Sequence, residues 1–203
     1  MSFLEPVFLI KTAGYIGLFF IVFAESGLFI GFFLPGDSLL FTAGFLASQD
    51  FLNIWFLVPL VFSAAILGDN VGYAFGRRVG PHIFKKEDSI FFHKDHVRRA
   101  EAFFKEHGPK TLVLARFTPV IRTFAPIVAG VGHMHYPTFL FYNVVGAVLW
   151  AIGMPLLGYF LGAFVPGVDQ YLLPIILVII TISMLPGVFH IGREYLAHKK
   201  RNK

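Results

Sequence analysis

The chain has 203 residues, of which 56% are hydrophobic and 14% charged, with a formal net charge of +5 and a mean hydropathy of +0.71. Soluble domains are roughly half apolar and roughly a quarter charged, so this composition excludes an ordinary soluble domain and predicts an integral membrane protein. The absence of cysteine excludes disulfides, thiolate nucleophiles and thiolate metal ligands.

Five apolar stretches follow one another along the chain, at residues 7–46, 54–75, 111–131, 139–164 and 171–191. A helix needs about 20 apolar residues to cross the hydrocarbon core of a bilayer. By this measure the second, fourth and fifth stretches are single crossings. The first is too long for one crossing and is interrupted by Pro35, Gly36 and Asp37, while the third has the right length but contains two arginines and two prolines.

The distribution of basic residues predicts how these two irregular stretches are arranged. Of the 17 Lys and Arg residues, nine lie in residues 77–110 and five in residues 193–203, whereas the connections at 48–53 and 166–170 have none. The positive-inside rule places both basic segments in the cytoplasm. The chain between them then crosses an even number of times, so residues 111–131 must enter and leave on the cytoplasmic side. By the same reasoning residues 7–46 form one crossing from a cytoplasmic N-terminus and a hairpin that enters from outside.

Each predicted hairpin has a proline at its break, because proline removes a backbone donor and disfavours helix in the preceding residue. Backbone freed in this way is tolerated at membrane depth only where protein or a water-filled cavity satisfies it. The predicted fold class is an all-α integral membrane protein, a helix bundle with two oppositely oriented re-entrant helical hairpins, as in an inverted repeat.

We expect a single membrane domain over residues 1–203. Residues 7–76 hold the first crossing, the outside hairpin and the second crossing, and residues 111–192 hold the cytoplasmic-side hairpin and two further crossings. Residues 77–110 form a basic cytoplasmic connection, in which apolar side chains at three- and four-residue spacing over 94–107 predict an amphipathic surface helix. Residues 193–203 are a basic cytoplasmic tail. These basic residues are expected to meet anionic lipid headgroups and not nucleic acid, because no folded module presents them.

Ionisable residues inside the apolar stretches are the candidates for function. A charge at a helix centre costs about 2.5–3.5 kcal/mol, and such residues usually face an interior cavity. Glu25 and Asp37 bracket the descending arm of the first hairpin, and two arginines flank the break of the second. If the hairpin tips meet, two carboxylates and two guanidiniums share one polar cavity. The full set is Glu25, Asp37, Asp69, Arg116 and Arg122.

Two interpretations of this set remain open. A static cluster of ion pairs could hold two otherwise unstable hairpins together. Alternatively the arginines bind an anion, because a guanidinium stays charged and matches phosphate oxygens with paired donors. Burial disfavours the ionised form of a carboxylate and a neighbouring arginine favours it, which is the balance that a proton-coupled carrier needs. This hypothesis assigns substrate binding to Arg116 and Arg122 and proton coupling to Glu25 and Asp37.

Supporting roles fall to the residues at the two breaks, Pro35, Gly36 and Pro119, and to Asp69, which could equally be a helix-packing group. His133 and His135 are two residues apart and do not share a helical face, so an interfacial pair is favoured over a metal site. No metal, no cofactor and no catalytic residue is expected, and the sequence leaves open whether the chain forms a homo-oligomer.

Three segments together resemble the DedA family of bacterial membrane proteins, which shares its core domain with eukaryotic VTT-domain proteins. They are Glu25-Ser26-Gly27 with Phe33-Leu34-Pro35-Gly36-Asp37-Ser38, then Gly68-Asp69-Asn70-Val71-Gly72-Tyr73 with Gly76-Arg77, and Arg116-Phe117-Thr118-Pro119-Val120-Ile121-Arg122 running on to Trp150. The resemblance implies paired re-entrant hairpins and return of undecaprenyl phosphate, the lipid carrier of cell-wall precursors, across the cytoplasmic membrane. It also implies dependence on the proton motive force and a requirement for Glu25, Asp37, Arg116 and Arg122.

The sequence therefore predicts a proton-coupled translocase, located in the bacterial cytoplasmic membrane, whose partners are membrane lipids, a polyprenyl phosphate substrate and protons. One alternative is a proton-coupled transporter of a small solute, and another is translocation of a different phospholipid such as phosphatidylethanolamine. A lipid phosphatase is the least favoured, because such chemistry calls for a histidine nucleophile and the apolar core offers none. We expect a transport protein and not an enzyme.

Overall fold

The computed structural model describes residues 6–28, 36–83, 102–165, 167, 171, 174–179 and 181. Over these ranges the regular elements are all helical, which confirms the predicted all-α class; entry of the hairpins into the membrane from opposite sides stays a prediction. The elements are α1 (Pro6–Gly27), α2 (Gly36–Ser48), α3 (Ile54–Ile83), α5 (Thr111–Ala115), α6 (Pro119–Val131), α7 (Tyr136–Ala147), η2 (Val148–Ile152) and α8 (Gly153–Phe164). Pro35, most of the predicted amphipathic helix, most of the fifth apolar stretch and the basic tail lie outside the described residues.

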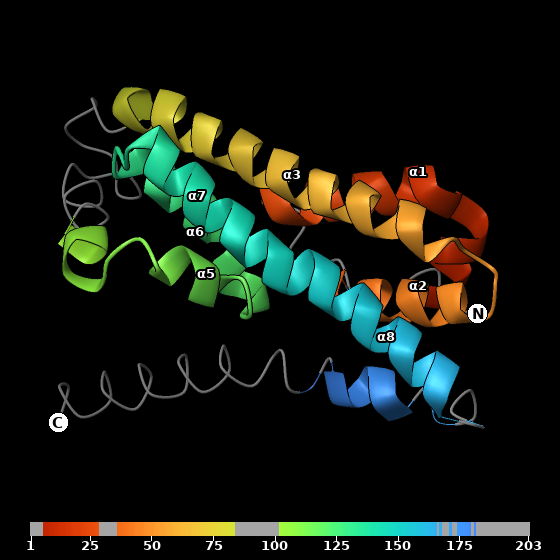
Figure 1. Ribbon diagram of the computed structural model, residues 1–203. Helices are drawn as coiled ribbons and strands as arrows, with labels where there is room; N and C mark the ends of the chain where they lie inside the picture. Colours follow the sequence, from red (N-terminus) through yellow and green to blue (C-terminus); the bar gives the residue numbers. More distant parts are fainter. Residues whose placement is uncertain are drawn as a thin grey trace, which may run out of the picture.

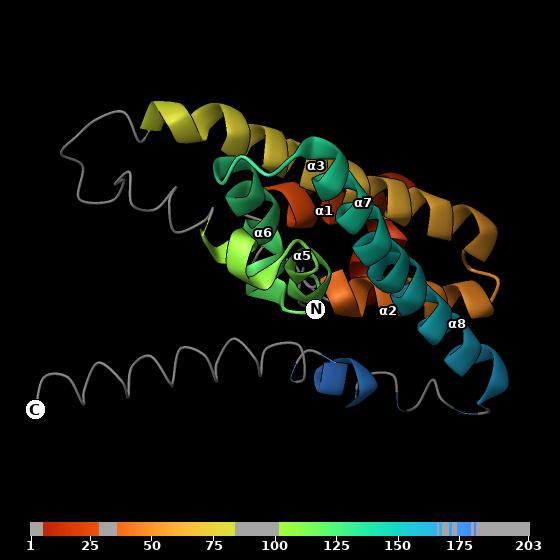
Figure 2. The same ribbon diagram turned by 60° about the vertical axis from the view of Figure 1, so that its left-hand side comes forward.

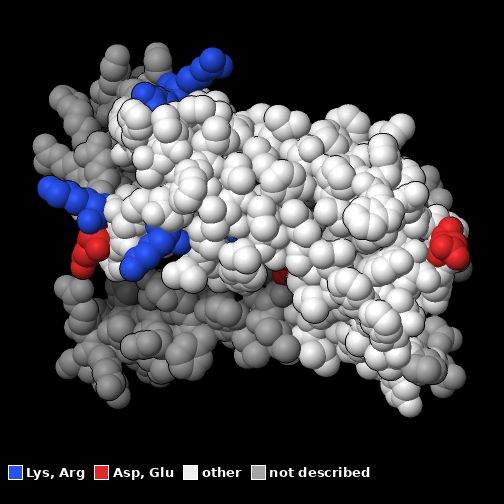
Figure 3. Space-filling model, in the orientation of Figure 1, with Lys and Arg blue, Asp and Glu red and all other residues white. Residues whose placement is uncertain are grey.

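Two of the described helices are long and apolar enough to cross a membrane, Ile54–Val79 and the continuous span Tyr136–Phe164 that α7, η2 and α8 form. Only 33% of the most apolar part of each is buried inside the protein. Large apolar side chains such as Trp55 and Ile16 are exposed instead, and a broad uncharged surface separates charged side chains at the two ends of the molecule (Figure 3). Since so large an apolar surface is not stable in water, the outer faces of these helices are suited to lipid.

Helices α1 and α2 form a helix–break–helix unit at the end of the molecule where α3 begins (Figures 1 and 2). The Tyr15 hydroxyl accepts a hydrogen bond from the backbone N–H of Asn53 at 2.6 Å, just before α3 starts. At the other end of α1, Gly27 packs against the backbone of Gly68, near the middle of α3. Helix α2 then returns towards the start of α3. This hairpin therefore opens at one end of the molecule and breaks near its centre.

The start of α1 differs from the prediction made from the sequence. Gly14 has φ of 56° and ψ of −153°, a conformation that favours glycine, and it kinks the helix. Residues 6–13, which precede the kink, span about 12 Å as a helix. A bilayer core is about 30 Å thick, so residues 6–13 do not cross it by themselves, and the separate first crossing before the hairpin stays a prediction.

Helices α5 and α6 form a second helix–break–helix unit, at the end of the molecule where α3 finishes (Figure 1). Helix α5 stops at Ala115, and α6 begins at Pro119 after Thr118, which is extended at φ −121° and ψ 109°. Proline requires such an extended residue before it and suits the first position of a helix, which explains the break. Helix α6 packs along α3 towards the end of that helix, where Gly130 lies against Tyr73. The second hairpin therefore opens opposite to the first.

The span α7–η2–α8 packs against both hairpins. Its first part, α7, packs against α5 and α3, and its last part, α8, packs against α2. The contact with α2 is close, because Gly158 lies against the backbone of Phe41 and Gly44 lies against Pro155. Small residues allow such close approach of helices in a membrane, where packing and not the hydrophobic effect drives association.

Candidate functional site

Arg122 lies where the two hairpin breaks meet. It stands in the first turn of α6 and is buried. Its Nη1 donates a hydrogen bond to Asp37 Oδ1 at 2.5 Å, and its Nη2 forms an ion pair with Glu25 Oε1. Glu25 stands in the last turn of α1 and Asp37 in the first turn of α2. One guanidinium therefore joins the second hairpin to both sides of the first break, as the sequence predicts for facing tips.

Gly36 completes the first break. Its backbone N–H donates a hydrogen bond to Glu25 Oε1 at 3.2 Å, so the carboxylate contacts the start of α2 directly. A Cβ at this position would overlap the Glu25 carboxyl group. Only glycine therefore allows the acid to lie this close to the helix that it faces. Pro35 lies outside the described residues, and Pro119 contributes through the backbone break that it imposes on α6.

Trp150 is a member of this group that the candidate set drawn from the sequence did not include. Its indole Nε1 donates a hydrogen bond to Asp37 Oδ1 at 2.6 Å, and its ring lies 4.6 Å from the guanidinium carbon of Arg122, within cation–π range. Trp150 belongs to η2, a π-helical turn, and such turns are frequent at functional sites. A tryptophan at mid-span could have drawn attention, because tryptophan in membrane proteins is enriched at the interfaces.

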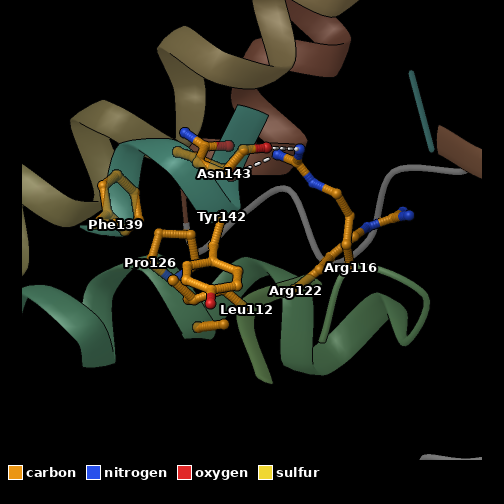
Figure 4. A pocket seen from close by; sticks show the side chains of 9 residues that line it. Leu112, Arg116, Arg122, Pro126, Phe139, Tyr142 and Asn143 are labelled. Carbon is orange, nitrogen blue, oxygen red and sulfur yellow. Dashed lines mark hydrogen bonds and ion pairs between the residues drawn. The ribbon is translucent and has the colours of Figure 1, made fainter. Parts of the chain in front are cut away.

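Arg116 has a different partner from the one that we expected. It lies in the turn between α5 and α6, and its Nη2 forms an ion pair with Asp69 of α3. Its Nη1 donates to the backbone carbonyl of Asn143 on α7 at 3.2 Å (Figure 4). The site is therefore two adjoining groups, one around Arg122 and one around Arg116, and not a single set of two acids and two arginines. Asp69 therefore belongs to the site, as the acid that pairs with Arg116.

The five ionisable side chains carry an excess of negative charge. Glu25, Asp69, Arg116 and Arg122 are each at most 6% exposed, and Asp37 is partly buried. Three carboxylates face two guanidiniums, so the group has one surplus negative charge when all five are ionised. An uncompensated buried charge is costly, and a single proton on the carboxylates would balance it. Glu25 Oε2 and Arg122 Nε have no hydrogen-bond partner in the described part of the chain.

A small cavity lies beside the two arginines. Its volume is about 10 Å³, room for roughly one water molecule, and its lining includes Asp69, Arg116 and Arg122. Figure 4 shows Phe139, Tyr142 and Asn143 closing it from α7 and Leu112 and Pro126 closing it from the second hairpin. This cavity beside the arginines therefore has no room for anything larger than water.

His133 and His135 lie beyond the end of α6 and are exposed. They do not line the cavity beside the arginines and make none of the contacts described above with the buried charges.

Comparison with known proteins is consistent with this arrangement. Residues 34–160 match the model of the VTT domain. The chain is 46% identical to Protein DedA of Escherichia coli K12 over 188 residues, which cover 92% of this chain and 85% of that protein. It is 44% identical to an uncharacterized membrane protein of Mycobacterium leprae, covering 98% and 92% of the two chains. It is 34% identical to the inner membrane protein YqjA of E. coli K12, covering 81% and 79%.

No solved structure is matched. The family match covers the second hairpin break, the end of the first, all of the charged groups except Glu25, and most of the long span that carries Trp150. Long apolar helices, buried charges at facing breaks and these relatives lead to one conclusion. The chain is a membrane protein that belongs to the DedA family and carries its VTT domain.

Proposed function

We propose that the protein is a translocase, dependent on the proton motive force, that returns an anionic lipid carrier across the cytoplasmic membrane. The proposed carrier is undecaprenyl phosphate. The observation that carries this proposal is the position of Arg122, whose guanidinium is bound by Glu25 and Asp37 where the two hairpin breaks meet.

The chemistry of this contact suits exchange between a carboxylate and a phosphate. A guanidinium pairs with either anion through the same planar set of donors. Protonating Glu25 or Asp37 would weaken its hold on Arg122 and free donors for a phosphate group. Arg116 would provide a second guanidinium, once it separates from Asp69. Substrate binding therefore falls to the arginines, proton coupling to Glu25 and Asp37, and control of Arg116 to Asp69.

The surroundings of the arginines favour a lipid over a small solute. The central cavity holds about one water molecule, so a soluble substrate has no room in this conformation. The outer face of the second hairpin is apolar and exposed beside the arginines, at Leu114, Phe117, Ile121 and Phe124. A polyprenyl chain could remain in the bilayer along this face while its phosphate passes between the hairpins. Another phospholipid such as phosphatidylethanolamine, or a small solute, remains the alternative.

The proposed orientation places the end of α3 and the basic connection in the cytoplasm. Arg77 and Arg78 are exposed at this end, and charged side chains gather there in Figure 3. Basic residues flank membrane segments mainly on the cytoplasmic side. The second hairpin then enters from the cytoplasm and the first from outside, in a multi-pass protein of the inner membrane whose C-terminus is cytoplasmic.

The test is transport of a polyprenyl phosphate in proteoliposomes under an imposed proton gradient. We expect gradient-driven transport that is lost in Arg122→Gln and in Glu25→Gln. The control is Asp50→Asn, because Asp50 is exposed and its positive φ of 59° is one that asparagine tolerates. Undiminished transport in a folded Arg122→Gln protein would reject the proposal. Uptake of a soluble solute, or release of phosphate from the lipid, would instead support a solute carrier or a phosphatase.

A further inference from the structure

A second cavity lies along α3, between the central charges and the basic end of the helix. We name it the Arg77 pocket, and its volume is about 450 Å³. It is more open to the outside than the central cavity. Its lining residues are Asn70, Tyr73, Ala74, Arg77, Arg78 and Tyr136. The pocket is thus large enough for a phosphate headgroup and is lined mainly by polar and aromatic side chains.

The guanidinium of Arg77 is held in a fixed position in this pocket. Its Nη1 donates to the Tyr73 hydroxyl at 2.6 Å, and its carbon lies 5.9 Å from the centre of the Tyr73 ring. The same hydroxyl donates to the backbone carbonyl of Met134 at 2.6 Å. Because Tyr73 is itself buried, this chain of contacts orients Arg77 before any ligand arrives.

The opposite wall is equally ordered. The Tyr136 hydroxyl donates to Asn70 Oδ1 at 2.9 Å, and the Tyr73 and Tyr136 rings lie 5.7 Å apart. Arg116 and Arg122 each form an ion pair with a carboxylate, but in the described part of the chain Arg77 forms none. An oriented guanidinium that has no acidic partner among the described residues, in an open pocket, is suited to binding the anionic group of a ligand.

The Arg77 pocket is aligned with the central site. Asp69, Tyr73 and Arg77 follow one another at four-residue spacing and share one face of α3, over about 12 Å. Phe139 stacks on Tyr73, with ring centres 4.3 Å apart, and also lines the central cavity. The two sites are therefore neighbours separated by an aromatic pair.

We propose that the Arg77 pocket is an outer binding site, on the cytoplasmic side of the central charges, for the phosphomonoester headgroup of a lipid, which occupies it after leaving Arg116 and Arg122. This inference deepens the proposed function and rests on its substrate class. Arg77 contacts the phosphate, while Tyr73 positions Arg77. The Tyr73 and Phe139 rings separate the outer site from the closed centre.

Direct binding tests this site without transport. The full-length protein in detergent is titrated with farnesyl phosphate, a short polyprenyl phosphate, and in parallel with farnesol and inorganic phosphate. We expect farnesyl phosphate to bind, and Arg77→Gln to weaken that binding roughly ten- to hundredfold, as loss of a charged hydrogen bond does. Tyr73→Phe should weaken it less, since it removes only the group that orients Arg77. The control is Lys105→Gln, an exposed cation outside the pocket.

The double variant Glu25→Gln/Arg122→Gln separates this inference from the proposed function. Binding that persists in it, and is lost in Arg77→Gln, supports an outer site even if no transport is ever observed. Binding lost in the double variant but kept in Arg77→Gln overturns the outer site. Equal affinity for inorganic phosphate overturns the lipid assignment, and equal affinity for farnesol overturns recognition of the phosphate.

Discussion

Replacing Arg122 by glutamine tests how much the contact between the two hairpins stabilises the protein. The substitution leaves Glu25 and Asp37 close together, with Glu25 fully buried, and without the cation that joins them. Removing one partner of a buried ion pair typically costs about 3–5 kcal/mol. For a chain of this size each kcal/mol lowers the melting temperature by roughly 2–4 °C. We therefore expect Arg122→Gln to melt roughly 6–20 °C below the wild type in the same detergent.

The matched variant is Glu25→Gln/Asp37→Asn/Arg122→Gln, which removes all three charges and preserves the volume of the two acids. We expect it to recover most of the lost stability, since no charge is left unpaired at this contact, while transport in proteoliposomes stays absent. Thermal unfolding measured alongside transport decides between the two roles. If the neutral variant transports at the wild-type rate, the charges are structural only. If Arg122→Gln melts like the wild type, the contact does not hold the hairpins together.

Three further predictions concern the residues around this contact. Asp69→Asn should lower stability by about 3–5 kcal/mol, because it leaves a buried arginine without its acid, and thermal unfolding checks this. Trp150→Phe keeps a ring over the guanidinium but loses the indole N–H, and should slow transport roughly tenfold in the proteoliposome assay without preventing folding. Gly158→Ala places a methyl group against the backbone of α2 and should lower the free energy of unfolding by about 1–3 kcal/mol. Its control is Gly153→Ala, whose methyl group meets nothing within 4 Å and should leave stability unchanged or slightly higher in the same unfolding assay.

The sequence was informative where a local rule has a strong physical cause. Proline at the start of α6 predicted the second break, and charge inside apolar stretches identified all five ionisable members of the site. The meeting of Glu25 and Asp37 with an arginine at the facing breaks also followed, because buried opposite charges are stable only when they pair.

Other features depend on which helices lie side by side, which a single sequence does not encode locally. Nothing near Arg116 indicates that its partner is Asp69 and not one of the other two acids, since the choice is made by the packing of α3 against the second hairpin. The hydrogen bond from Trp150 to Asp37 depends in the same way on where η2 passes the first break. The kink at Gly14 was missed because glycine is also common in straight membrane helices.

The π-helical turn at η2 has a consequence for how one helix serves two partners. A π turn closes its hydrogen bonds one residue later than an α turn, so it inserts one extra residue into the helical repeat. The contact positions of α7 and α8 are therefore out of phase along the sequence, in the one continuous helix that packs against α5 and α2. Deleting one residue here would restore a uniform repeat and rotate α8 by roughly 100° relative to α7. The glycines of α8 would then face away from α2. The span would keep its contact with the second hairpin but lose its close contact with the first.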